Sequence, residues 1–353
     1  MSGVFTRAPV LQFDHLQAST ETLLADERVL AVIGSDLLGD AARCANAGGA
    51  DAGLADARAF DLGFAVLPAG APPMRQVLRS RRRVEQVQHQ ALRGATDGDY
   101  LFLSADIATD QPTRAATATA YTQLLAAAPE LGFAHLVRIW NCIPNINLGD
   151  GDAEQYRQFC VGRFEAFAKL ARVPAYPAAS ALGLRQGVGR IGLLAARFPA
   201  AAIENPRQLS AFLYPPLYGP SSPSFSRASL LPTESGDVLL VSGTAAITGH
   251  ASMHPGDVDA QLRLALANIS AVVAAAEGPP DVFSARSGTA LTAQRSVDIQ
   301  LRVYLRHAEL QPHAQLGLAA CLGVPSSVEW LQADICRREL LVEVEAVLCW
   351  GRP

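Results

Sequence analysis

Several common features are scarce in this sequence of 353 residues. It contains a single lysine, Lys169, and aromatic residues make up only 7% of the chain. The formal net charge is −4, so the basic surplus that attracts nucleic acids is missing. No apolar run approaches the roughly 20 residues of a membrane-spanning helix, and the N-terminus lacks the apolar core of a signal peptide. We therefore expect no nucleic-acid partner and no membrane partner.

The cysteines are few and widely spaced. They are Cys44, Cys142, Cys160, Cys321, Cys336 and Cys349, and no two of them form a CxxC pair. Reduced thiols in a cytoplasmic protein are the simplest interpretation. We expect neither a metal ion nor another cofactor. Half of the residues are hydrophobic, and a chain of this length can bury a large core in two domains.

One pattern occurs twice in the sequence. Residues 98–107 read GDYLFLSADI and residues 236–245 read GDVLLVSGTA, with a serine at the seventh position of each copy. Each copy is followed by a helical stretch, a second strand, a second helix, a segment that begins with proline and a last apolar strand. Internal repetition constrains the architecture before any single residue is interpreted. It predicts an α/β (α+β) fold built from two similar units.

Apolar periodicity places the elements of these units. Strands are expected at 100–107, 135–146, 191–204, 237–247, 297–310, 325–336 and 339–350, and helices at 117–131, 153–170, 256–276 and 312–324. Before the repeats, the sequence predicts strands at 29–35 and 62–68. Residues 72–93 follow two prolines and predict a weak helix, whose arginines would form a solvated face.

The same elements divide the chain into four segments. Residues 1–96 are expected to form an N-terminal extension that packs on the first unit, at residues 97–204. Residues 236–353 form the second unit. Between the units, residues 205–235 are rich in proline, serine and tyrosine. Because a long loop inside a compact domain is commonly functional, we expect this one to border the active site.

The last strand, in the sequence LLVEVEAVL, carries two glutamates in an apolar setting. Alternation places Glu343 and Glu345 on one face of the strand. Burial of that face would raise the pKa of Glu343 above its ordinary value of about 4.3, which suits a general acid near neutral pH. An exposed face with two ordinary glutamates explains the same pattern, so the strand alone leaves both interpretations open.

Residues 236–348 resemble the reactive-intermediate deaminases of the RidA/YjgF family. The likeness rests on GDVLLVSG, DVDAQLRLALANISAVV, LRVYL and LLVEVEA. It implies that each unit is a small mixed sheet backed by two helices. The deaminases carry an arginine after the proline of a short "PAR" segment, and here that segment reads Pro325-Ser326-Ser327. The loss argues against imine deamination by the usual route.

Over its whole length the chain more closely resembles the chorismatases, a two-part elaboration of the same fold. The supporting segments are RIWNCIPNIN (138–147), QYRQFCVGRFEAF (155–167), NPRQLSAFLYPPLYGPSSPSFSRA (205–228), SGTAAITGH (242–250) and LQADICRRELLVEVE (331–345). Chorismatases cleave chorismate and release pyruvate. The resemblance is closest to the hydroxybenzoate-forming branch, which implies 3-hydroxybenzoate, 4-hydroxybenzoate or both as the ring product.

The resemblance also implies catalytic roles for two residues. Glu343 matches the acid that protonates the enolpyruvyl ether. Cys336 lies seven residues earlier, and we expect it on the adjacent strand, brought near Glu343 by a hairpin. It matches a cysteine that helps to steer the product, although a buried cysteine often packs simply as a small apolar residue.

A dianionic substrate needs fixed cations, and arginine forks suit its two carboxylates. The candidates for substrate binding are Arg163, Arg227, Arg207, Tyr214, Tyr218 and Gly249. Arg163 and Arg227 are our first choices for the carboxylates, the tyrosines would add phenol donors, and the glycine would leave room beside the ring. For each arginine, simple surface exposure is the alternative, and Gly249 also suits an ordinary turn.

Three other motifs carry less weight. Residues 187–192 formally match GxGxxG, but no buried strand precedes them and no acidic residue follows at the required distance. His250 and His254 have the spacing of helical metal ligands, yet Pro255 and Gly256 follow at once. Ser242 lacks the GxSxG context of a nucleophile elbow.

Three alternative functions stay open at this point. One is hydrolysis of chorismate to a dihydroxy-cyclohexadiene carboxylate. Another is a RidA-like imine or enamine hydrolase, and the last is a non-catalytic module that binds aromatic acids. RidA-like units expose an apolar sheet face that the family buries in trimers. Because two units share this chain, we expect a monomer whose only partner is its small-molecule substrate, chorismate.

Overall fold

The computed structural model describes residues 9–37, 56–68, 73–170, 175–280, 282–283, 297–322 and 327–351. Pro325 and Ser326, of the segment that departs from the deaminase pattern, lie outside these ranges, as does Cys44. The five described cysteines are free thiols.

The predicted repeat is confirmed in the order of the strands. The first unit consists of β8 (Tyr100–Ile107), α3 (Thr113–Glu130), β9 (His135–Pro144), α4 (Gln155–Ala168), β10 (Ala178–Leu184) and β11 (Gly189–Ala196). The second consists of β14 (Gly236–Ala245), α5 (Val258–Ala275), β17 (Val297–Leu305), α6 (Gln311–Leu322), β18 (Ser327–Gln332) and β19 (Val342–Trp350). Their sheets run β10-β9-β11-β8 and β18-β17-β19-β14, each with one parallel pair at the β10 or β18 end.

The N-terminal segment builds a third sheet of the same kind. It contains β1 (Leu11–Leu16), α1 (Thr20–Leu24), β2 (Val29–Gly34), β3 (Ala59–Asp61) and β5 (Arg75–Ser80). The strand order is β1-β5-β2-β3, with β2 and β3 parallel and β5 antiparallel to both of its neighbours. This is the connectivity of the two repeats, although the sequence reveals only two copies.

Shorter strands extend the sheets of the two units at their edges. β6 (Glu85–His89) and β7 (Leu92–Thr96) extend the first unit beyond β8, and β4 (Ala65–Val66) pairs with β18. β12 (Ala201–Ile203) and β13 (Ala228–Thr233) extend the second unit beyond β14. The helix predicted at 72–93 is therefore wrong, because this stretch forms β5, β6 and the start of β7. The single element expected at 191–204 divides into β11 and β12, which belong to different sheets.

The described chain has few other regular elements. They are the two-stranded hairpin of β15 (Ile247–Thr248) and β16 (Ala251–Ser252), and the short 3-10 helices η1 (Gly151–Ala153), η2 (Ala211–Leu213), η3 (Pro216–Tyr218) and η4 (Ala308–Leu310). Two of these short helices lie in the loop that separates the units.

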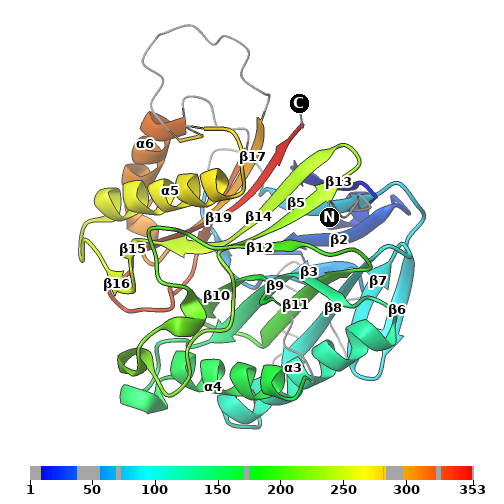
Figure 1. The fold of residues 1–353 in the computed structure, drawn as a ribbon, viewed down its shortest axis with the longest axis horizontal. Coiled ribbons are helices and arrows are strands. Elements are labelled where there is room, and N and C mark those ends of the chain that lie inside the picture. The colour runs from blue at the N-terminus through cyan, green and yellow to red at the C-terminus, as the bar shows by residue number, and fades with distance from the viewer. Residues whose placement is uncertain are drawn as a thin grey trace, which may run out of the picture.

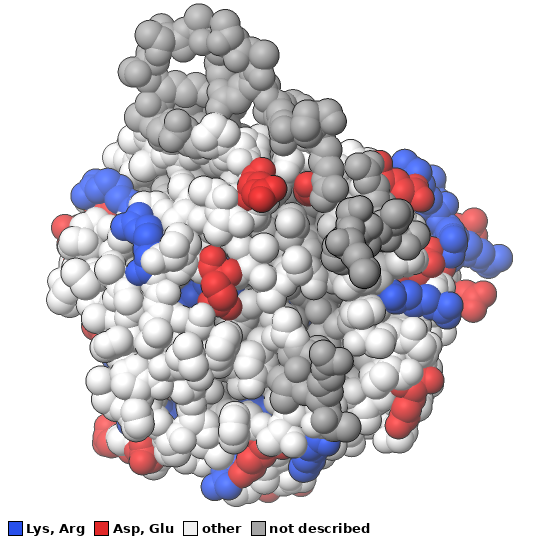
Figure 2. All heavy atoms as spheres, viewed as in Figure 1, with Lys and Arg blue, Asp and Glu red and all other residues white. Residues whose placement is uncertain are grey.

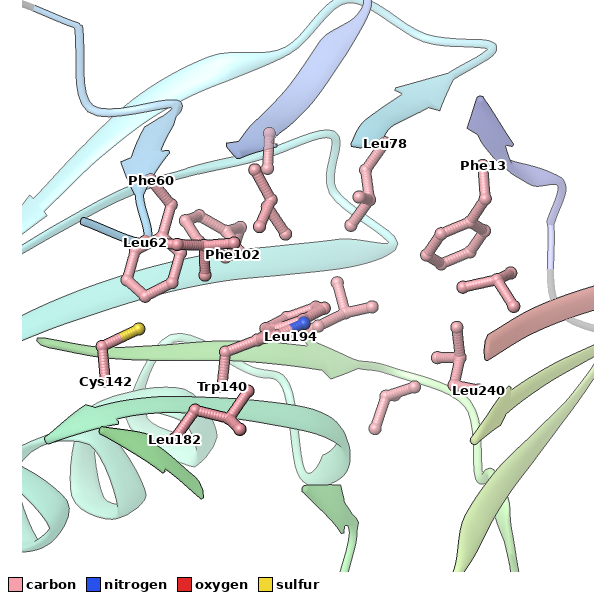
Figure 3. Close-up of a cluster of buried hydrophobic side chains, with 14 of the residues drawn as sticks. Phe13, Phe60, Leu62, Leu78, Phe102, Trp140, Cys142, Leu182, Leu194 and Leu240 are labelled. Atoms are coloured by element: carbon pink, nitrogen blue, oxygen red, sulfur yellow. The ribbon is translucent and has the colours of Figure 1, made fainter. Parts of the chain in front are cut away.

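The three sheets turn one face toward a shared apolar core, and the helices cover their outer faces (Figure 1). Figure 3 shows this core, with Phe13 and Leu78 from the N-terminal sheet, Phe102 and Leu194 from the first unit, and Leu240 from the second. Separate clusters lie between each sheet and its own helices. The shared core fixes the sheets relative to one another, and the cavity described below lies between two of them.

Helix α5 is the one helix among the described residues that is long and apolar enough to cross a membrane. Half of it is buried inside the protein, where it packs against β14 and β19. Core helices of this length pass the same test of length and composition, so α5 is weak support for a membrane span.

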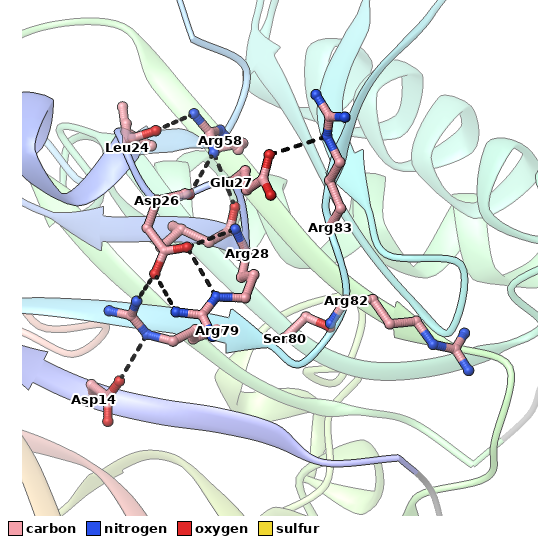
Figure 4. Close-up of polar contacts among 11 residues, drawn as sticks. Asp14, Leu24, Asp26, Glu27, Arg28, Arg58, Arg79, Ser80, Arg82 and Arg83 are labelled. Carbon is pink, nitrogen blue, oxygen red and sulfur yellow. Dashed lines mark hydrogen bonds and ion pairs between the residues drawn. The ribbon is translucent and has the colours of Figure 1, made fainter.

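The arginines near β5 are paired with acids, as expected for a solvated face. Arg79 forms ion pairs with Asp14 and Asp26 (Figure 4), and Arg83 lies 3.3 Å from Glu27. On the face of the molecule in Figure 2, basic and acidic side chains alternate at the edge and the middle is largely uncharged. This face therefore offers no continuous basic field.

Candidate active site

One cavity of about 370 Å³ brings together most of the predicted site residues. It lies where β10 of the first unit packs against β14 of the second (Figure 1), and β19 supplies its inner wall. Helix α4, the loop at 205–228, the loop before β19 and the loop at 145–154 complete it. The lining residues used below are Arg163, Ser180, Tyr214, Tyr218, Arg227, Gly243, Cys336, Arg337 and Glu343.

Glu343 lies on β19 and is only 4% exposed, so the interpretation as an exposed strand face is wrong. Burial raises the pKa of Glu343 to about 8, helped by the negative charge of Glu345 and opposed by Arg138 and Arg306. The carboxyl group is therefore largely protonated at neutral pH while it faces a cavity. A buried, protonated carboxyl in a cleft has the properties of a general acid.

Gly243 makes room for this carboxyl group. A Cβ atom at position 243 would overlap Oε1 of Glu343, so only glycine leaves the present rotamer free. The Gly243 amide donates a hydrogen bond of 3.0 Å to Oγ of Ser180, which ties β14 to β10 beside the acid. No sequence pattern indicates this role, because a glycine inside a strand usually marks a bulge. The register of β14 against β19 does shift between Val241 and Thr244.

Arg163 is 1% exposed although it carries a charge. It lies on α4, its guanidinium carbon is 5.0 Å from the centre of the Phe159 ring, and its Nε and Nη2 have no hydrogen-bond partner among the described residues. Unpartnered donors on a buried charge are costly unless a ligand satisfies them. Because Arg163 also lines the cavity, it has the properties of an anion-binding residue.

Arg227 supplies a second buried cation from the loop between the units. Its Nη2 donates to the carbonyl of Leu209 at 2.8 Å and to the hydroxyl of Tyr214 at 2.9 Å. Its Nε has no partner in the described structure. Two guanidinium groups with unpartnered donors therefore line one cavity, and each could bind one carboxylate of a dianionic ligand.

A third arginine in the cavity wall was missed by the sequence interpretation. The guanidinium carbon of Arg337 lies 3.9 Å from the centre of the Tyr218 ring, and its Nη1 donates to the carbonyl of His250 at 2.9 Å. The Tyr218 hydroxyl lies 3.1 Å from Nδ1 of His250. The only available signal was the Arg337-Arg338 pair itself, which is indistinguishable in sequence from a solvated turn.

Cys336 lines the cavity, but its predicted position on an adjacent strand is wrong. It lies in the loop between β18 and β19, and β17 separates these two strands in the sheet. Burial raises the pKa of the Cys336 thiol to about 12, with a further contribution from Glu343. At neutral pH the group is a neutral thiol beside the carboxyl group, so it can pack against a ligand or donate weakly to it.

Two predicted substrate contacts do not line the cavity. Arg207 is exposed at the surface. Gly249 lies in the turn of the β15–β16 hairpin with a φ of +59°, and a Cβ atom there would meet nothing within 4 Å. The structure thus gives Gly249 the geometry of a turn glycine, and its influence on the product stays a prediction.

The other motifs find ordinary structural roles. Gly189–Ala196 is a β-strand, so residues 187–192 do not open a helix as a dinucleotide site requires. His254 lies outside any helix, and the described residues contain no group of three or more acidic, histidine or cysteine side chains placed to hold a metal. Ser242 is buried and donates to the carbonyl of Ser226.

Comparisons with known proteins indicate one family. Residues 76–195 match the model of the chorismatase FkbO/Hyg5-like N-terminal family. A 3-hydroxybenzoate synthase of Streptomyces hygroscopicus is 35% identical over 285 residues, which cover 79% of this chain and 82% of the relative. A chorismatase of Streptomyces rapamycinicus is 38% identical, with 75% and 79% covered.

A solved structure extends the likeness to almost the whole chain. A chorismatase crystal structure superposes with a TM-score of 0.76 at 31% identity, over 97% of this chain and 98% of the other. The shared fold is thus an α/β assembly of mixed sheets backed by helices. The chain belongs to the chorismatase family.

The first prediction concerns the acid. Glu343→Gln preserves the shape of the side chain but removes its acidic proton, so turnover should fall by roughly 10²–10⁴-fold. In the unaltered protein, kcat/KM should be level below pH 8 and should fall as pH rises through about 8, because only protonated Glu343 can donate. Steady-state kinetics across pH test both effects. Near-normal turnover by the variant would remove Glu343 from the mechanism.

The second prediction concerns the buried arginines. Arg163→Ala and Arg227→Ala each remove a charge-assisted contact worth about 1.5–3 kcal/mol, so the substrate should bind roughly 10- to 100-fold more weakly. Arg207→Ala removes an exposed arginine that does not line the cavity and serves as the matched control. Titration calorimetry on catalytically silent Glu343→Gln backgrounds gives the affinities. Equal affinity in the control and either test variant would show that the wrong arginine was chosen.

Proposed function

We propose that this protein cleaves the enolpyruvyl ether of chorismate and releases pyruvate, with Glu343 as the general acid. The single observation that carries the proposal is a buried, protonated carboxyl group that faces a cavity lined by arginines with free donors. The relatives named chorismatase and 3-hydroxybenzoate synthase supply the substrate class.

The chemistry follows from the substrate. Protonation of the methylene carbon of the enol ether creates an oxocarbenium-like cation, and the proton comes from Glu343. Once ionised, the same carboxylate stabilises the cation that it has created. The two substrate carboxylates would lie against Arg163 and Arg227, with Tyr214 and Tyr218 as phenol donors. This arrangement would hold the reacting carbon against the acid.

The ring product depends on which oxygen captures the cation. If a hydroxyl group of the ring captures it before water, elimination restores the aromatic ring, and pyruvate and hydroxybenzoate together hold all the atoms of chorismate. If water captures it, the resulting hemiketal collapses to pyruvate and the dihydroxy-cyclohexadiene acid, and these two products together hold the atoms of chorismate plus one water. We favour the first course, with 3-hydroxybenzoate, 4-hydroxybenzoate or both. Cys336 in the cavity wall supports it, and Gly249 is a further candidate.

The alternative functions are less well supported. A non-catalytic binding module requires Glu343 to be exposed or dispensable, and the residue is 4% exposed beside the cavity. An imine or enamine hydrolase would also begin by protonating an electron-rich double bond. In the deaminases an arginine follows the proline that matches Pro325, and this chain has Ser326 there instead.

The third prediction is the decisive assay. Purified protein should release pyruvate from chorismate with no added metal or nucleotide, since Glu343 itself supplies the proton. Pyruvate is measured with lactate dehydrogenase, and the ring product is identified by chromatography. Activity that disappears with EDTA and returns with zinc would contradict the mechanism. If the diol is the only ring product, the roles assigned to Cys336 and Gly249 are wrong although the chorismatase activity remains.

The fourth prediction concerns assembly, and with it we propose a monomeric cytoplasmic enzyme. The inner faces of all three sheets meet in one core within a single chain, so the described strands already bury against one another the apolar faces that a second copy would otherwise cover. Multi-angle light scattering should give the mass of one chain, 37.3 kDa. A stable trimer at low micromolar concentration would overturn the proposal.

A further inference from the structure

The strand that carries Glu343 carries a second buried carboxyl group that does not line the cavity. Glu345 is 6% exposed and lies two residues along β19, on the same face of the strand. It borders a separate space of about 10 Å³ deeper between the sheets, which has the size of a single water molecule. Glu345 therefore cannot touch a ligand in the cavity, although its charge lies close to Glu343.

Two arginines from different units hold Glu345. Nη2 of Arg138, on β9 of the first unit, lies 3.1 Å from its Oε1, and Nη1 of Arg302, on β17, lies 3.3 Å from its Oε2. Arg302 also contacts Glu329 at 2.6 Å. With two guanidinium groups and two carboxylates, the buried network is neutral as a whole.

Arg138 connects this network to the active site. Its Nη2 also donates to Oγ of Ser180 at 2.5 Å, and its Nη1 donates to the carbonyl of Val241 at 2.8 Å. Ser180 and the neighbouring Gly243 line the cavity beside the Glu343 carboxyl group. Without a counter-charge, the fixed cation of Arg138 would favour ionisation of Glu343, and an ionised carboxylate cannot act as the acid.

We propose that Glu345 is a positioning residue that neutralises Arg138 and so keeps Glu343 protonated and ready to donate. The inference rests on the proposed role of Glu343 as the general acid. It assigns a function to a carboxylate that touches no substrate and whose own ion pairs would otherwise serve only to join the two units.

The other groups that face Glu343 do not replace this effect. Tyr304 lies opposite Glu343 on β17, and its pKa is raised well above the ordinary value by burial, so it stays neutral. Cys336, in the loop before β19, is also neutral near pH 7. Arg306 is a second cation that lowers the pKa of Glu343, but it lies 3.1 Å from its own counter-ion, Asp334. Glu345 is thus the negative charge that raises this pKa.

The fifth prediction tests the inference with Glu345→Gln. The variant keeps the shape of the side chain but leaves Arg138 without its counter-charge. The fall of kcat/KM with pH, expected near pH 8 in the unaltered protein, should move down by about one to two pH units. Below both transitions, at about pH 5, the rate should stay within a few-fold of the unaltered enzyme. An unmoved transition, or an equal loss at every pH, would mean that Glu345 is only structural.

Two matched variants sharpen the comparison. Glu345→Asp keeps the negative charge and should hold the transition closer to pH 8 than Glu345→Gln does. Glu329→Gln also removes one buried carboxylate of the same network, but its direct partner is Arg302 rather than Arg138. It should therefore move the transition less. A shift as large as that of Glu345→Gln would show that any charge loss in the core has this effect and would overturn the specific role.

A direct titration separates this inference from the proposed function. The side-chain carboxyl carbons of ¹³C-labelled glutamate are followed by NMR in the full chain, with Glu343→Gln used to assign the key signal. Glu343 should be protonated at pH 7, and Glu345→Gln should lower the pKa of Glu343. If the titration shifts while turnover does not follow, the acid role fails and the tuning stands. An ionised Glu343 at pH 7 in the unaltered protein would refute the inference even if no variant folds.

Discussion

The fold depends on the burial of three sheet faces against one another. Each sheet needs helices on one side and an apolar partner on the other, and the chain supplies both for all three sheets. Any charge on the shared face must then be paired or neutral, because an isolated ion there is very costly. That constraint explains why Glu345 forms ion pairs with both Arg138 and Arg302. It also explains why Glu343, for which no ion pair is found among the described residues, stays protonated.

The two repeated units differ at the positions of the two glutamates. Val241 pairs with Ala346 in the second unit as Leu103 pairs with Leu193 in the first, which aligns Glu343 with Arg190 and Glu345 with Gly192. In the first unit a Cβ atom at Gly192 would already press on the ring of Phe60, which comes from the N-terminal sheet. The ring of Phe60 thus occupies in the first unit the place that the Glu345 side chain takes in the second. The N-terminal segment completes the core at this point, whereas the second unit carries a buried carboxylate there.

The sequence predicts whatever is local or repeated. The two Gly-Asp strands and their helices are visible because their periodicity lies within single segments, and Glu343 is visible because alternation is a property of one strand. The N-terminal sheet was not recognised because its strands are short and polar residues interrupt them, as Arg75, Gln76 and Arg79 do in β5. The roles of Gly243 and Arg138 were not predicted for another reason. Each depends on a contact with a residue about 100 or more positions away, Glu343 for Gly243 and Glu345 for Arg138. Such a contact leaves no pattern in either segment alone.

The site has to reconcile two opposed electrostatic demands. A dianionic substrate calls for several arginines, and each of them favours the ionised form of a nearby carboxyl group. The structure separates these demands in space. Arg163 and Arg227 reach the cavity from α4 and the loop, away from β19, and neither is among the charges that act on Glu343. The two cations that do act on it are Arg138, from the facing sheet, and Arg306, and each lies beside a carboxylate, Glu345 and Asp334 respectively. A substrate's own negative charge would favour the protonated form of Glu343 further, so substrate binding and protonation of the acid support each other.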